Sequence, residues 1–145
     1  VLALGLGMLI GADPVRTLLT TPWGITAGVL GAVLTIEHRI IATGYNGAAP
    51  GEPDCLEGAC PRGRLDYDAV PGLGDYDRPG TEGFCIAIHA EVNALLFATR
   101  DTKGATAYIT DPPCPGCRKA LAAAGIVRAV WPDGSHDRAG LTNWG

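Results

Sequence analysis

The segment that most constrains the fold runs from Ala105 to Gly125, where an apolar strand, a proline-rich turn and an alanine-rich helix follow one another. The turn reads PPCPGC, at Pro112–Cys117, and the helix is predicted over Cys117–Gly125, with Gly125 as its C-terminal cap. A second apolar strand is predicted at Ile126–Pro132. Strand, helix and strand in succession favour a layered α/β fold whose later strands are parallel.

The elements before this segment are consistent with the same fold class. Two β-prone runs, Val29–Thr35 and Arg39–Tyr45, are separated by a short connection and predict a β-hairpin. An alanine- and leucine-rich run that begins near Ile88 and ends before Gly104 is apolar all round and predicts a buried helix. The predicted order is hairpin, loop, helix, strand, helix, strand.

Residues 47–84 are rich in glycine, proline and polar side chains, and they predict one long loop insertion. Loops of this length are uncommon in compact domains and are often functional. The chain has 145 residues and no repeat or linker, so we expect a single domain over 1–145. Residues 1–24 are the least defined part: their apolar start is shorter than a membrane span and lacks a signal peptide's charged region.

The charge balance restricts the partners. With 11 basic against 15 acidic residues, the net charge is −4 and no basic stripe is present, which disfavours polynucleotide binding. A small anionic ligand needs only one or two arginines and backbone amides, so it stays compatible with this composition. Five cysteines are an odd number, which argues against a full disulfide framework and favours reduced or metal-bound thiols in the cytoplasm.

Cys114 and Cys117 lie three positions apart, so both can share one face of a first helical turn. Pro115 suits the first helical position, and a helix N-terminus favours thiolates. Alone, such a pair is compatible with a structural zinc site, a redox pair or no site at all. His89 can supply a third ligand, and three protein ligands with an open fourth position are typical of catalytic zinc.

Glu91 follows His89 by two residues at the start of the first predicted helix. Zinc lowers the pKa of a bound water to about 7, and a nearby carboxylate can then carry a proton to a leaving group. The alternative is a helix-capping charge near the dipole. Together, the HAE and PCPGC stretches match the H-x-E and P-C-x-x-C signature of zinc-dependent nucleobase deaminases.

With these motifs, the sequence resembles the cytidine/deoxycytidylate deaminase superfamily, and within it the deoxycytidylate (dCMP) deaminase branch. The resemblance implies a layered α/β fold with a mixed five-stranded sheet and helices on both faces. It implies Zn²⁺ held by His89, Cys114 and Cys117, with Glu91 as the proton shuttle. The segments that carry it are Leu30–Gly51, His89–Ala98, Gly104–Cys117 and Ala122–Trp131.

The same resemblance implies further roles. Asn46, in GYNG, matches a position that contacts the sugar, and Ala90 can offer its backbone to the base. Trp131 falls where an aromatic often lies near the substrate, and Arg100 matches a position tied to effector response or subunit contact. Each has an ordinary interpretation as well: a turn asparagine, a helix alanine, a packing aromatic and a solvated charge.

The chain departs from the branch in its cysteines. Some members hold a second, structural zinc with a cysteine before the first strand and another after GYNG. Here Cys55 matches the later position, but the earlier partner is missing. Cys60 and Cys85 could complete a three-thiol cluster that clamps the long loop; the default alternative is packed, free cysteines.

The resemblance implies hydrolytic deamination of a cytosine nucleotide, dCMP to dUMP with release of ammonia, in nucleotide metabolism. It also suggests a homo-oligomer and regulation by dCTP and dTTP. Two alternatives stay open. One is deamination of another base, in a nucleoside, in guanine, in a riboflavin intermediate, or in tRNA or single-stranded DNA. The other is a non-catalytic zinc- or nucleotide-binding module.

Overall fold

The computed structural model describes residues 31–66, 69 and 76–145. The chain divides into two units. The sheet unit comprises the described residues up to Tyr45 together with Ala90–Gly145, and the loop unit comprises Asn46–His89. Within the described ranges, no helix is long and apolar enough to cross a membrane. The expectation for residues 1–24 lies outside the described residues.

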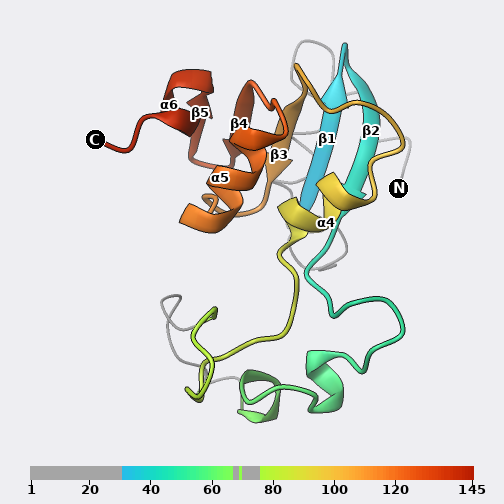
Figure 1. The fold of residues 1–145 in the computed structure, drawn as a ribbon, viewed down its shortest axis with the longest axis vertical. Helices are drawn as coiled ribbons and strands as arrows, with labels where there is room; N and C mark the ends of the chain where they lie inside the picture. Colours follow the sequence, from blue (N-terminus) through green and yellow to red (C-terminus); the bar gives the residue numbers. More distant parts are fainter. Residues whose placement is uncertain (1–30, 67–68, 70–75) are drawn as a thin grey trace, which may run out of the picture. The chain divides into compact units, whose positions relative to one another are not determined.

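The sheet unit begins with the predicted hairpin, formed by β1 (Ala32–Ile36) and β2 (Arg39–Gly44) (Figure 1). Two residues join the strands, Glu37 and His38, and both adopt left-handed backbone angles, with φ of 50° and 65°. Two consecutive positive φ values define the tight turn whose twist matches that of an antiparallel pair. The hairpin prediction is confirmed.

Five strands form one sheet in the order β2-β1-β3-β4-β5. Strands β3 (Thr106–Ile109) and β4 (Arg128–Trp131) pair in parallel, as predicted, whereas the other neighbouring pairs are antiparallel. The sheet is therefore mixed and five-stranded, as the resemblance implied. The edge strand β5 (Gly134–Asp137) escaped the sequence analysis, because GSHD is polar and carries no apolar alternation.

Helix α4 (Ala90–Leu96) is shorter than the sequence predicted, and the expected extension towards Gly104 is wrong. Tertiary hydrogen bonds explain the early end. The Thr102 hydroxyl donates to the Ala124 carbonyl at 2.9 Å, and the Gly104 N–H donates to the Gly125 carbonyl at 2.9 Å. These bonds draw the chain after Leu96 towards the end of the next helix, which outweighs its local helix propensity.

Helix α5 (Pro115–Ala123) starts two residues before the predicted Cys117, with Pro115 as its first residue. Gly125 follows its end with φ of 78°, as expected for a helix C-terminal glycine. A last short helix, α6 (Arg138–Thr142), was not predicted; the Asp137 carboxylate caps it by accepting from the Gly140 N–H at 2.7 Å.

The core of the sheet unit lies between the sheet and helices α4 and α5, which cover one face (Figure 1). Helix α4 packs very closely on β2: a Cβ at Gly44 would lie 2.0 Å from the Ala90 carbonyl oxygen, so the site requires glycine. On the opposite face, Val33, Tyr108 and Val130 form a second buried cluster. Of the helices expected on both faces, the described residues include those of the first face.

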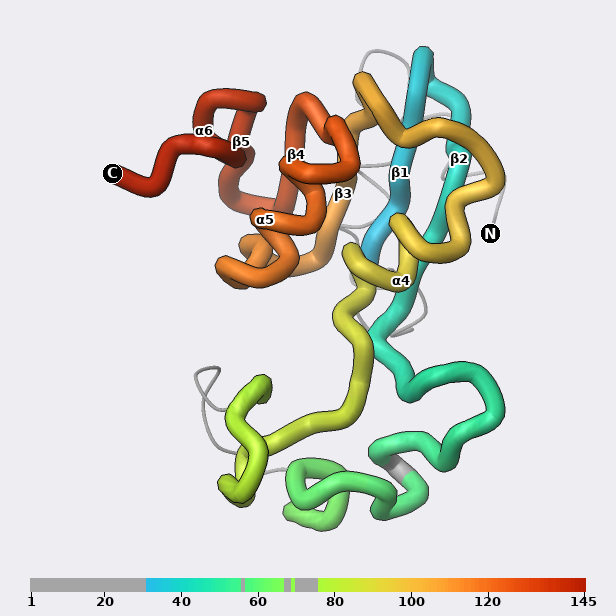
Figure 2. The backbone as a smooth tube through the Cα atoms, in the orientation of Figure 1, coloured from blue at the N-terminus to red at the C-terminus, as the bar shows by residue number. Residues whose placement is uncertain are grey.

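The loop unit has little regular structure, in keeping with the long loop predicted over 47–84 (Figure 2). Its described elements are two 3-10 turns, η1 (Cys55–Glu57) and η2 (Arg62–Arg64). An isolated antiparallel bridge joins Gly47 to Ile88, with hydrogen bonds of 3.2 and 2.8 Å. The bridge therefore closes the loop unit at the two ends of its chain.

Candidate metal centre

His89 directly precedes α4 and is half-buried. The bridge between Gly47 and Ile88 fixes the backbone on its N-terminal side. The Tyr76 ring meets the imidazole edge-on, with ring centroids 5.7 Å apart, and the Arg62 guanidinium lies over the Tyr76 ring, 4.1 Å from its centroid. The Tyr76 ring therefore restricts the orientation of the imidazole.

Cys114 and Cys117 are placed by the start of α5. Cys114 is the N-cap residue, and its sulfur accepts a hydrogen bond from the Cys117 N–H at 3.4 Å. Pro115 occupies the first helical position, where its missing N–H costs nothing. The prolines and glycine of PPCPGC thus shape a helix entry that presents both sulfurs together.

The ligand atoms of His89, Cys114 and Cys117 all lie within 4.8 Å of one another. Burial, followed by the neighbouring Glu91 carboxylate and the Cys114 thiol, raises the pKa of the Cys117 thiol. A divalent cation would offset this accumulation of negative charge. One imidazole and two thiolates are donors that zinc prefers, and three protein donors leave a fourth position open. The residues therefore fit a zinc ion.

Glu91 lies in the first turn of α4 and is half-buried. It is near enough to Cys117 to act on the pKa of that thiol, both through its charge and through a side-chain hydrogen bond. A carboxylate is thus held beside the three donors. This is the arrangement that proton transfer at a metal centre needs.

The comparisons with known proteins agree with this site. A family model described as the cytidine and deoxycytidylate deaminase zinc-binding region matches residues 24–132. The chain belongs to this family. The matched range contains His89, Glu91, Cys114 and Cys117. The family's region is described as zinc-binding, which agrees with the donors of the His89, Cys114 and Cys117 group.

Two curated members of the deaminase family are similar over most of the chain. Deoxycytidylate deaminase of Mycobacterium phage D29 is 48% identical over 104 residues, covering 71% of this chain and 77% of that protein. Deoxycytidylate deaminase of Enterobacteria phage T4 is 36% identical over 126 residues, covering 70% of this chain and 65% of that protein.

One solved structure is also similar, the crystal structure of dCMP deaminase from the cyanophage S-TIM5 in apo form. The TM-score is 0.47 at 24% identity, and the matched region covers 70% of this chain and 64% of the cyanophage chain. The likeness is too distant to add to the family assignment.

The other predicted site residues of this deaminase-family chain differ in their surroundings. Asn46 is exposed and precedes the bridged Gly47. Ala90 is buried as the first residue of α4. Trp131 ends β4 and packs edge-on against the His136 ring, with centroids 5.0 Å apart. The sequence analysis placed Arg100 on the same helix as Glu91. This is wrong, because α4 ends at Leu96.

Asn93 and Tyr76 were given no role by the sequence analysis. Asn93 is buried in α4, and its side-chain N–H donates to the Tyr45 carbonyl at 2.8 Å. This bond fixes the chain directly before Asn46. The spacing HAE-x-N places Asn93 and Ala90 on one helix face, which was the available signal for a buried position. No sequence signal connects Tyr76 with His89, because they lie thirteen positions apart within an irregular loop.

A second group of donors lies in the loop unit. The sulfur atoms of Cys55, Cys60 and Cys85 all lie within 4.8 Å of one another. Burial and the two neighbouring thiols raise the pKa of Cys55 to about 12. For Cys60, burial opposes ionisation, but hydrogen bonds from the backbone of Ile86 and Gly63 outweigh it and lower the pKa. The three-thiol cluster considered in the sequence analysis is therefore a geometric possibility in this structure.

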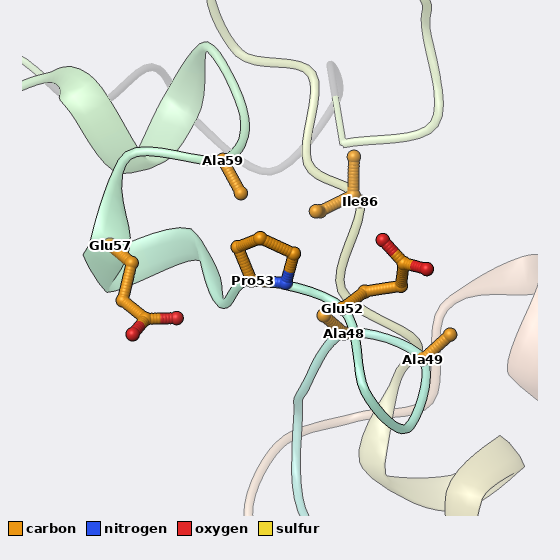
Figure 3. A pocket seen from close by; sticks show the side chains of 7 residues that line it. All are labelled: Ala48, Ala49, Glu52, Pro53, Glu57, Ala59 and Ile86. Atoms are coloured by element: carbon orange, nitrogen blue, oxygen red, sulfur yellow. The ribbon is translucent and has the colours of Figure 1, made fainter.

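The loop unit also contains an open hollow of about 490 Å³ (Figure 3). Its lining is mainly apolar and includes two carboxylates, those of Glu52 and Glu57. Negative charge at the rim disfavours a phosphate group, so the hollow does not suit a nucleotide phosphate. Its lining residues are Ala48, Ala49, Glu52, Pro53, Glu57, Ala59 and Ile86.

Proposed function

We propose that this chain is a zinc-dependent deaminase that converts dCMP and water into dUMP and ammonia. The observation that carries the proposal is the Glu91 carboxylate next to a His89, Cys114 and Cys117 donor group that fits zinc. A purely structural metal site has no use for such a carboxylate. The relatives from phages D29 and T4, both named deoxycytidylate deaminase, support dCMP as the substrate.

His89, Cys114 and Cys117 would hold the zinc, which supplies Lewis-acid activation of water near neutral pH. Glu91 accepts a proton from the attacking water and delivers it to the amino group that leaves from C4 of the cytosine. A C–O bond forms at C4, the C4–N bond breaks, and the nitrogen departs as ammonia. The half-buried position of Glu91 limits its access to bulk water, which favours this directed transfer.

Three further residues would position the nucleotide. Asn46 directly precedes Gly47, which is bridged to Ile88, the residue directly before His89. This arrangement supports a hydrogen bond between the Asn46 amide and a hydroxyl of the sugar. The Ala90 backbone would contact the base, and Trp131 would add an aromatic surface. The bridge supports this role of Asn46, because it pairs the residue after Asn46 with the residue before His89.

Around this site we propose a single domain over 1–145 that acts in the cytoplasm on mononucleotides rather than polynucleotides. The net charge of −4 supports the exclusion of polynucleotides. We further propose a homo-oligomer, with Arg100 in effector response or subunit contact and with dCTP and dTTP as regulators. Two exposed apolar side chains near the end of α4, those of Leu96 and Phe97, support a contact surface for another subunit there.

The test is ammonia release by the zinc-loaded chain on dCMP, with deoxycytidine, cytidine, CMP, guanine and a cytosine-containing oligonucleotide in parallel. Glu91→Gln removes the proton carrier while retaining size and polarity, and we expect kcat to fall about 100- to 10,000-fold with unchanged zinc content. The control is Glu37→Gln, which changes an exposed carboxylate in the hairpin turn.

Turnover of another compound in the panel, lost in the Glu91 variant, would retain the mechanism and change the substrate. Zinc bound to a folded protein that deaminates nothing in the panel would contradict the proposal and favour a non-catalytic binding module.

A further inference from the structure

Arg62 is a half-buried cation at the first position of η2, within the loop unit. Among the described residues, its guanidinium has two partners. One is the Gly83 carbonyl, at a long hydrogen-bond distance of 3.5 Å, and the other is the Tyr76 ring, whose centroid lies 4.1 Å away. Neither partner carries a negative charge, although the chain has 15 acidic residues. Arginine is seldom taken out of water without an anion, so this guanidinium has N–H groups available to bind one.

The backbone around Arg62 is fixed by contacts within the same unit. The Arg62 N–H donates to the Phe84 carbonyl at 3.2 Å. The next residue has to be glycine, because a Cβ at Gly63 would lie 1.9 Å from the Cys55 carbonyl oxygen. The Tyr76 ring supports the flat guanidinium through a cation–π contact. A cation that is positioned in this way loses less conformational entropy when a ligand binds.

The same tyrosine connects Arg62 with the metal-binding histidine. The Tyr76 ring packs edge-on against His89, with centroids 5.7 Å apart, and the Arg62 guanidinium lies over that ring. Asn46, proposed above for the sugar, precedes Gly47, which is bridged to the residue before His89. In a mononucleotide, the sugar separates the base from the phosphate. The loop unit therefore provides, near its metal ligand, a polar side chain for the sugar and a cation for the phosphate.

We propose that Arg62 binds the 5′-phosphate of the nucleotide and makes the site select dCMP over deoxycytidine. This inference rests on the proposed function and adds the residue that recognises the phosphate. A guanidinium can bind phosphate through two parallel charge-assisted hydrogen bonds, which a nucleoside without phosphate cannot form. The open hollow with Glu52 and Glu57 in its lining has the wrong charge for this group, whereas Arg62 has the right one.

Arg64 offers a matched control in the same 3-10 turn. It is exposed, and its Nε donates to the Gly58 carbonyl at 2.7 Å. Among the described residues, it has no contact with the Tyr76 ring. Removing its charge therefore changes the electrostatics of the turn without changing the group that we assign to the phosphate.

The experiment compares deamination of dCMP and of deoxycytidine by the zinc-loaded protein and its variants. In Arg62→Gln, we expect KM for dCMP to rise about 10- to 100-fold, because hydrogen bonds between a charged donor and the phosphate are lost. For deoxycytidine, kcat/KM should change by less than about twofold. Arg62→Lys retains the charge without the planar fork, so its KM for dCMP should be intermediate. Arg64→Gln should behave as the unchanged protein does.

Binding of dUMP provides a readout that needs no turnover. In isothermal titration calorimetry, Arg62→Gln should bind dUMP about 10- to 100-fold more weakly than the unchanged protein, whereas deoxyuridine should bind equally to both. An unchanged KM for dCMP in Arg62→Gln would overturn the inference. So would equal losses with dCMP and deoxycytidine, because Arg62 would then act only by holding Tyr76 and His89.

The two proposals fail in different ways. If the unchanged, zinc-loaded protein deaminates neither compound, the proposed function is contradicted for both of them. The dUMP titration then decides the role of Arg62 by itself: weaker dUMP binding in Arg62→Gln supports phosphate recognition, and equal binding contradicts it.

Discussion

The sheet unit and the loop unit are held together in different ways. In the sheet unit, fully buried Leu34, Ile109 and Leu121 belong to one apolar core under α4 and α5. In the loop unit, the sulfurs of Cys55, Cys60 and Cys85 lie within 4.8 Å of one another. Apolar burial stabilises in proportion to area, whereas a metal cross-link acts through a few strong bonds. The two units therefore differ in the side chains that meet inside them, which are apolar in the sheet unit and thiols in the loop unit.

The two donor groups also differ in their ligand atoms. The group of His89, Cys114 and Cys117 mixes nitrogen with sulfur and has the Glu91 carboxylate beside it. The group of Cys55, Cys60 and Cys85 is all sulfur. A mixed group with an open position suits chemistry, and an all-thiolate group suits a cross-link. The contrast predicts different consequences when each unit is perturbed.

The largest effect should follow from removing metal. Structural zinc contributes on the order of 10 kcal/mol in small zinc-dependent peptides. A metal clamp at the three thiols, as considered in the sequence analysis, therefore predicts that amides of residues 55–63 and 85–87 lose hydrogen-exchange protection after chelation. Amides of β1, β3 and β4 should keep theirs, because the apolar core does not depend on the ion. Equal loss of protection in both units, or none in either, would remove the distinction between them.

The next largest effect should come from the apolar core. Leu34→Ala deletes a side chain with 0% exposure, and we expect the free energy of unfolding to fall by about 2–5 kcal/mol in urea denaturation. Ile40→Ala, at a position with 58% exposure on the neighbouring strand, should change it by less than about 0.5 kcal/mol. Similar losses from both substitutions would argue against this core assignment.

A smaller effect is expected from loss of the hydrogen bond between the Asn93 side chain and the Tyr45 carbonyl, directly after β2. Asn93→Ala removes the donor to the Tyr45 carbonyl, and we expect a loss of about 1–3 kcal/mol in the free energy of unfolding. Because this bond fixes the chain before Asn46, KM for dCMP should rise more than kcat falls. Asn143→Ala, at the exposed C-terminal cap of α6, is the matched control. A change confined to kcat would mean that Asn93 does not act through the nucleotide-positioning segment.

Much of the sheet unit was accessible from the sequence, because its signals are local. The hairpin follows from two β-prone runs with a short connection, and the start of α5 was predicted to within two residues, at Cys117 rather than Pro115. The end of α4 could not be predicted, because it depends on Thr102 reaching the Ala124 carbonyl across 22 positions. The edge strand β5 forms from polar residues because β4 offers it a pairing partner.

The sequence by itself determined which atoms are available for chemistry: the imidazole of His89, the carboxylate of Glu91, and the thiols of Cys114 and Cys117, each next to a helix start. Only the tertiary structure decided how Cys55, Cys60 and Cys85 meet, and that Tyr76 packs on His89. The physical reason is range. Helix starts and tight turns are fixed by neighbouring dihedral angles and hydrogen bonds, whereas contacts across a 30-residue irregular loop depend on the path of the whole segment.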